Sequence, residues 1–148
     1  APVASVYLGW DRAAVAHPLD GFGFLIPSRE REPVLGVLFI SSIFPSSAPP
    51  GRVALTAFVG GDPDGDLVER VAGVCARHLG ARGRPVFSHV TRWRAAIPQY
   101  EVGHLGRVAA IRAFEASTPG LLLAGSYLDG PSVPATLGSG LDAASRVG

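Results

Sequence analysis

Apolar and polar residues alternate at the start of the chain, in Val3-Ala4-Ser5-Val6-Tyr7-Leu8. Such alternation is typical of a strand with one buried face, so it predicts a strand over 3–10. The chain of 148 residues is long enough to bury a core. The pattern indicates a mixed α/β (α+β) fold with a strand-rich first part and an α/β tail. Further strands are predicted over 22–26, 34–42, 53–59, 86–93 and 121–124, the last short and buried, and helices between 66 and 80, over 103–116 and over 133–146.

Local signals mark the ends of the first predicted helix. Asp66 with Glu69 three residues later resembles a capping box, and Gly80 stands where a C-terminal cap is expected. The helical spacing of apolar residues predicts which faces are buried. In the first helix this face comprises Leu67, Val71, Val74, Cys75 and His78, and in the second it comprises Leu105, Val108 and Ile111.

The sequence contains no self-contained catalytic machinery. No G-x-S-x-G segment is present, and the four histidines are not spaced as a metal-binding pair on one helix, so no catalytic residue and no metal site are predicted. Cys75 is expected to be a buried structural thiol in a reducing compartment. A net charge of +1 gives no global attraction for nucleic acid. The arginines between 77 and 94 are interpreted as a solvated surface, with attraction to an acidic ligand or a membrane surface as the alternative.

The segment after the last predicted strand is rich in glycine and leads into a helix. Gly125 ends the apolar run, and Gly130 precedes Pro131-Ser132-Val133 at the helix start. Free backbone N–H groups and the positive end of the helix dipole are expected there, and they would suit a carbonyl or a reduced, anionic ring. An ordinary strand-to-helix turn is the alternative interpretation.

Four stretches of the chain carry a resemblance to a known family. They are Gly21 to Ser28, Val53 to Gly61, Arg92 to His104, and Leu122 to Gly125 continuing through Ser139-Gly140. In this order they resemble the C-terminal third of the FAD-dependent protoporphyrinogen oxidases, in the flavin amine-oxidase superfamily. The resemblance covers nearly the whole chain, and Ile97-Pro98-Gln99-Tyr100 with Gly103-His104 is its most specific part.

This resemblance implies a division of the chain between two domains of a longer protein. Residues 1–118 would be the C-terminal part of a mixed-sheet substrate domain, and 119–148 would be the strand and helix that close a Rossmann-like FAD domain. A missing N-terminal portion would hold the dinucleotide loop, so the chain alone is expected to be inactive. Carried over by position, the residues that line the flavin are Gly125, Gly130, Pro131, Ser132 and Val133.

The resemblance also implies a substrate and a reaction. Phe22, Leu25 and Phe58 match residues that contact the tetrapyrrole. The implied activity is oxidation of protoporphyrinogen IX or coproporphyrinogen III by O2 in haem biosynthesis. The expected location is the bacterial cytoplasm, with peripheral contact to the inner membrane.

Two other interpretations remain open at the level of sequence. One is a complete small α+β domain with a non-catalytic role in ligand binding or assembly. The other is the C-terminus of a different flavin amine oxidase or of a carotenoid desaturase.

Overall fold

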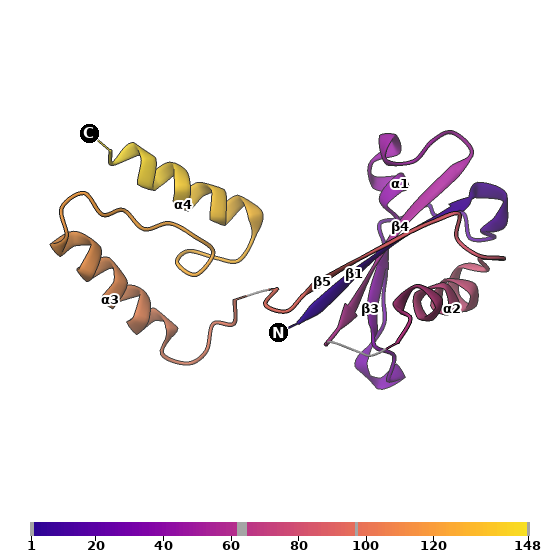
Figure 1. The fold of residues 1–148 in the computed structure, drawn as a ribbon, viewed down its shortest axis with the longest axis horizontal. Helices are drawn as coiled ribbons and strands as arrows, with labels where there is room; N and C mark the ends of the chain where they lie inside the picture. Colours follow the sequence, from indigo (N-terminus) through magenta and orange to yellow (C-terminus); the bar gives the residue numbers. More distant parts are fainter. Residues whose placement is uncertain (1, 62–64, 97, 148) are drawn as a thin grey trace. The chain divides into compact units, whose positions relative to one another are not determined.

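The computed structural model describes residues 2–61, 65–96 and 98–147, and it divides into two compact units, residues 2–96 and residues 98–147 (Figure 1). Ile97, the first residue of the most specific resembling stretch, lies outside the described residues. The first unit contains a sheet and the helix that covers it. The second contains two helices and the segment between them. The mixed α/β fold class predicted from the sequence is therefore confirmed.

The first unit is built on a five-stranded sheet with the order β2-β3-β4-β1-β5. Every neighbouring pair is antiparallel, as expected for strands whose two faces differ in polarity. Val6 of the inner strand β1 stands opposite Ala57 on one side and Val90 on the other. The strands are β1 (Val3–Asp11), β2 (Gly23–Leu25), β3 (Val34–Leu38), β4 (Arg52–Gly60) and β5 (Phe87–Trp93).

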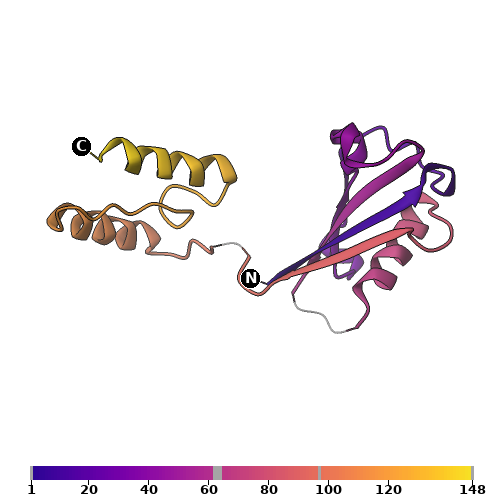
Figure 2. The same ribbon diagram turned by 45° about the horizontal axis from the view of Figure 1, so that its top comes forward.

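Helix α2 (Leu67–Leu79) covers one face of this sheet (Figure 2). The Asp66 carboxylate accepts hydrogen bonds from the Val68 and Glu69 N–H groups at 2.9 and 3.2 Å, and Gly80 ends the helix with φ of +61°. Both predicted helix ends are thus confirmed, because each signal satisfies backbone groups that a helix end leaves free. The core between helix and sheet includes Trp10, Leu55, Val59, Val71, Val74 and Cys75.

The strand predicted over 34–42 is shorter than expected. It ends at Leu38, and α1 (Ile40–Ile43) follows. Two serine side chains explain the change, because they bond to backbone groups of β4 and of the segment ahead of β2 and so hold the chain in a turn. Ser41 Oγ accepts from the Ala54 N–H at 3.1 Å, and Ser42 Oγ donates to the Leu19 carbonyl at 2.6 Å.

The second unit consists of α3 (His104–Ser117), α4 (Val133–Ser145) and the segment that joins them. The prediction that Leu105 faces inward is wrong, since this side chain is 84% exposed. Val108 and Ile111 are partly buried. The buried residues of α3 and α4 are Glu115, Ser139 and Ala143, and in the joining segment Leu128 is also buried.

The boundary between the two compact units falls after residue 96 in the sequence. The predicted division at residue 118 concerns two domains of a longer protein, and it stays a prediction. Among the described helices, none is long and apolar enough to cross a membrane.

Candidate functional site

The segment Leu121–Ala124 runs between α3 and α4 (Figure 1). It is not a strand within the described residues, so the strand predicted over 121–124 is not observed. A strand needs the backbone of a neighbour, and here side chains take that place. The Leu123 N–H donates to Glu115 Oε1 at 2.9 Å, and the Gly125 N–H donates to Ser139 Oγ at 2.9 Å.

Two glycines shape the turn that follows. Gly125 has φ of +149° and Gly130 has φ of +143°, a backbone conformation that residues with a side chain rarely adopt. A Cβ at Gly125 would lie 2.7 Å from Cε1 of Tyr127, and one at Gly130 would lie 3.2 Å from the Ala135 Cβ. Glycine is thus required at Gly125 by conformation and by space, and at Gly130 mainly by conformation.

The start of α4 is capped by its own side chain. Ser132 Oγ accepts from the Ala135 N–H at 3.2 Å, and the Ser132 carbonyl accepts from the Thr136 N–H at 2.9 Å. Pro134 has no N–H to offer. Among the described residues this leaves the Val133 N–H of the first turn without an acceptor.

A buried carboxylate fixes the chain that leads into this turn. Glu115 is only 6% exposed, and its oxygens accept from Arg112 at 3.1 Å and form an ion pair with Arg146 at 3.0 Å. The hydrogen bond from the Leu123 N–H, supported by those two guanidinium groups, outweighs desolvation and lowers the pKa of Glu115 to about 2. The carboxylate is therefore charged throughout the neutral range.

The predicted substrate residues lie in the first unit. Leu25 of β2 stands opposite Gly36 of β3, and Gly36 stands opposite Phe58 of β4, so the three form one row across the sheet. This row lies on the face opposite α2, because Leu55 and Ala57, which alternate with it, are buried in the core. A Cβ at Gly36 would lie 2.9 Å from Leu25 Cδ2, so the absent side chain leaves room for Leu25.

The structure brings Leu25 and Phe58 together, while Phe22 lies just ahead of β2. Leu25 is 83% exposed, and Phe22 is also exposed. The carbonyl of Phe22 accepts from the Phe39 N–H at 2.8 Å, which continues the pairing of β2 with β3. Phe58 is half-buried, so the exposed apolar surface of this region comes from Leu25 and Phe22, and such surface is available to a flat apolar ligand.

Sequence reasoning missed a cavity of about 630 Å³ on the same sheet face. Tyr7 and Thr56, which are paired across β1 and β4, form part of its floor, and Ile40 of α1 and Phe87 of β5 also line it. Thr56 is two residues from Phe58 on the same strand, so the cavity adjoins the Leu25–Phe58 row. The alternation of residues in β1 and β4 could have indicated the sheet face that forms the floor of this cavity. The side of the cavity formed by α1 could not be predicted, because α1 itself was not predicted.

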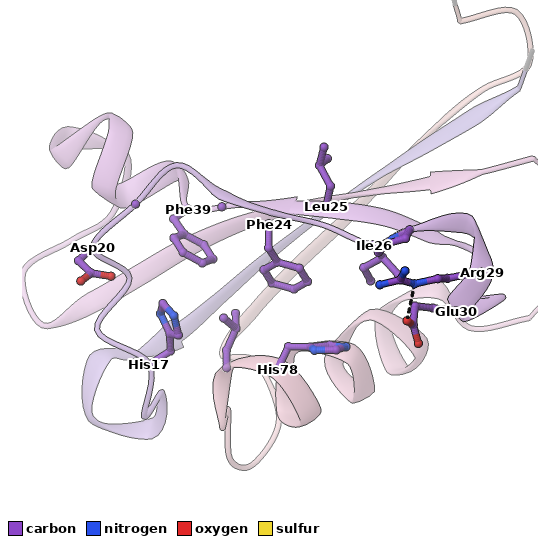
Figure 3. Close-up of a pocket in the computed structure, with 13 residues that line it drawn as sticks. His17, Asp20, Phe24, Leu25, Ile26, Arg29, Glu30, Phe39 and His78 are labelled. Atoms are coloured by element: carbon purple, nitrogen blue, oxygen red, sulfur yellow. Dashed lines mark ion pairs between the residues drawn. The ribbon is translucent and has the colours of Figure 1, made fainter.

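A second cavity, of about 590 Å³, lies at the β2 edge (Figure 3). Phe24 points into it and Leu25 points away, as alternate residues of a strand do (Figure 3). The Phe24 ring lies 5.3 Å from the His78 ring, and the Phe39 ring lies 5.5 Å from the His17 ring. The described residues contain no group of three or more His, Cys, Asp or Glu that could hold a metal ion.

Comparisons with known proteins give a consistent result. The family model of flavin containing amine oxidoreductases matches residues 1–148. The mitochondrial protoporphyrinogen oxidase of Nicotiana tabacum is 36% identical over 99% of this chain and 31% of its own length. The coproporphyrinogen III oxidase of Bacillus subtilis is 30% identical over 97% of this chain and 32% of its own length.

Solved structures agree with these relatives. A structure from Exiguobacterium sp. 255-15, described as that of a protoporphyrinogen oxidase, superposes with a TM-score of 0.79 at 27% identity and covers 97% of this chain and 34% of the other. A reduced UDP-galactopyranose mutase shares the fold alone, with a TM-score of 0.64 at 14% identity over 85% of this chain and 28% of the other. The chain thus spans about a third of the length of the relatives that it matches.

Proposed function

The chain belongs to the flavin containing amine oxidoreductase family, and on that basis we propose that it is the C-terminal part of an FAD-dependent porphyrinogen oxidase. The observation that carries the proposal is the turn from Gly125 to Val133, in a chain whose relatives are named as oxidases of protoporphyrinogen and coproporphyrinogen. The turn brings bare backbone and a helix N-terminus to one place, as a flavin-binding segment needs.

The residues of the turn fit an extended ring system. The missing side chains at Gly125 and Gly130 would let a planar group lie against the backbone, and Pro131 and Ser132 would continue this surface. The Val133 N–H, at the positive end of the α4 dipole, would favour negative charge on the group beside it. FAD, when bound, supplies the redox chemistry by accepting hydride and passing electrons to O2.

The open sheet face would take the substrate. Leu25 and Phe58 form apolar walls of the kind that a flat macrocycle contacts, with Phe22 at the edge of the same region. These side chains carry no titratable group, so their role is to bind and orient the porphyrinogen. No residue of this chain is assigned as a general base.

The electrons and hydrogens that leave the porphyrinogen are accepted overall by O2. A porphyrinogen loses six electrons and six hydrogens in three rounds, and three O2 become three H2O2 as the porphyrin forms. Either protoporphyrinogen IX or coproporphyrinogen III satisfies this chemistry. The part of the protein that holds the dinucleotide loop would precede these residues.

The test is to express the complete reading frame that encodes these residues and to record the visible spectrum of the protein. We expect the spectrum to show bound flavin. We also expect the protein to oxidise a porphyrinogen, which is measured by porphyrin fluorescence and O2 consumption. Parallel assays with protoporphyrinogen IX and coproporphyrinogen III identify the substrate. Flavin binding with turnover only of amines or carotenoids would assign the chain to another branch of the family, and a protein that binds no flavin would support a small binding domain.

Two substitutions separate the substrate face from the flavin turn. Phe58→Ala should raise KM for the porphyrinogen and leave the flavin content unchanged, because Phe58 lies on the sheet of the first unit. Leu35→Ala is the matched control, since Leu35 is an exposed apolar residue of β3 to which no substrate contact is assigned. Equal effects of the two substitutions on KM would contradict the assignment of Phe58.

We also propose that the enzyme acts in the bacterial cytoplasm and touches the inner membrane peripherally. The exposed arginines at 82, 84 and 94 support attraction to an acidic surface. Cell fractionation followed by a salt wash tests this location. Recovery in the salt extract would support peripheral contact, and recovery in the periplasm would contradict the proposal.

A further inference from the structure

The turn that would face the flavin is held by side-chain hydrogen bonds ahead of it and within it. Ahead of it, Glu115 accepts from the Leu123 N–H and Ser139 accepts from the Gly125 N–H, both at 2.9 Å. Within it, the Tyr100 hydroxyl donates to the Ser126 carbonyl. These contacts come from separate parts of the second unit.

Glu115 reaches the turn by a second route as well. Arg112 donates to Glu115 Oε2 through one terminal nitrogen and to Asp129 Oδ2 through the other, with both distances 3.1 Å. Asp129 directly precedes Gly130. The carboxylate of Glu115 therefore holds Leu123 directly and Asp129 through Arg112, which secures the turn before Gly125 and again before Gly130.

Ser139 provides the matching contact from α4. Its side chain is buried, and its hydroxyl donates to the Thr136 carbonyl at 2.9 Å while it accepts from Gly125. This pair of bonds fixes the direction of the hydroxyl lone pair toward Gly125. A helix interior gains little from a serine, so the position is explained by the bond to the turn.

We propose that Glu115 and Ser139 are positioning residues of the flavin site, which hold the backbone from Leu123 to Gly130 in the conformation that receives the flavin. The inference rests on the proposed function. Neither residue needs to touch the flavin: each acts through a backbone N–H of the segment, and Glu115 also acts through Arg112. Because these contacts already order the segment in the free protein, flavin binding does not have to pay the conformational entropy of ordering it. The affinity for the flavin is therefore higher.

The decisive experiment compares flavin binding by the complete protein with that of Glu115→Gln, Glu115→Ala and Ser139→Ala variants. Glu115→Ala should raise the Kd for FAD about tenfold, since it releases Leu123 and frees Arg112. Glu115→Gln should raise it less, about threefold, because an amide oxygen still accepts from Leu123. Ser139→Ala should lie between the two.

A second readout separates positioning from a purely structural role. Each variant is measured well below its melting temperature, and the flavin absorption spectrum and midpoint potential are recorded beside the Kd. A displaced turn changes the surroundings of the flavin and shifts both, whereas a purely structural role lowers only the melting temperature. Glu101→Gln is the matched control, because Glu101 pairs with Arg107 at 3.3 Å in the same unit and both side chains are exposed.

The same inference is tested in the 148-residue chain by hydrogen exchange. The amides of Leu123 and Gly125 should exchange at least about tenfold faster in the Glu115→Ala and Ser139→Ala variants respectively, and not in Glu101→Gln. Folded variants with unchanged exchange at these amides would overturn the inference and leave the proposed function standing. The same holds if the variants bind FAD with the affinity and the midpoint potential of the parent. A complete protein that binds no flavin would overturn both the proposed function and this inference.

Discussion

Gly125→Ala is the sharpest test of the turn, because the structure gives two separate reasons for its cost. The φ of +149° is strained for any residue with a Cβ, which costs about 1–3 kcal/mol. The new methyl group would also lie 2.7 Å from Cε1 of Tyr127, and such overpacking costs about 1–3 kcal/mol. Tyr127 is not fully buried, so its ring can relieve part of the collision. We expect a loss of about 3 kcal/mol in the stability of the second unit.

The matched control is Gly140→Ala in α4. The chemical change is the same, but a Cβ at Gly140 meets nothing within 4 Å and the residue is helical. Alanine is favoured over glycine in a helix interior by about 0.5–1 kcal/mol, so this substitution should stabilise the unit. The two glycine substitutions are thus expected to have opposite signs.

The assay is hydrogen exchange of α3 and α4 in the 148-residue chain, with tryptophan fluorescence as an internal reference. Both tryptophans, Trp10 and Trp93, belong to residues 2–96, so their urea transition should not move in either variant. Exchange in α3 and α4 should accelerate in Gly125→Ala and slow in Gly140→Ala. Equal exchange in the two variants would refute the assignment of strain to Gly125.

Three further results follow from the structure. Asp66→Ala should destabilise the first unit by about 1 kcal/mol and Asp66→Asn by less, as measured by urea unfolding with tryptophan fluorescence, because the side chain caps α2. The second unit should lose the contribution of Glu115 as pH falls from about 4.3 toward 2, since its pKa is lowered in the folded state to about 2; circular dichroism of the parent and Glu115→Gln shows this difference. Burial raises the pKa of Cys75 to about 12, so a thiol reagent at pH 8 should react only after denaturation, and the first unit should become less stable above about pH 9. Rapid labelling of native protein would contradict the burial of this thiol.

Local sequence patterns were sufficient to predict those parts of the structure that depend on residues close together in the chain. Alternation identified β1, because this strand buries one face against α2. Asp66 and Gly80 identified the ends of α2, because caps act within a few residues. The substrate contacts of Leu25 and Phe58 were predicted from resemblance and stay a prediction, while the register places both residues on one face of the sheet.

The remaining features depend on contacts between distant residues. The turn at α1 is stabilised by Ser42, whose hydroxyl bonds to the carbonyl of Leu19, and no pattern near Ser42 reveals that partner. The burial of Glu115 is similar, because glutamate is normally exposed and its partner Arg146 follows only after α4. Its pairing with Arg112 at three-residue spacing was visible in the sequence, but such pairs are usually exposed and weak.

The absence of a strand at 121–124 has a physical meaning for how this segment can join a sheet. The N–H groups of Leu121, Leu123 and Gly125 are all bonded inside the unit, to Thr118, Glu115 and Ser139 respectively. Alternate residues of an extended segment present their backbone groups at the same edge, so the N–H donors of this edge are already engaged. We therefore expect a strand from elsewhere in a longer protein to pair at the opposite edge, where Leu122 and Ala124 present their groups. The side chains of α3 and α4 thus take the place of a strand on one side of this segment, and they fix the side from which the rest of a sheet must approach.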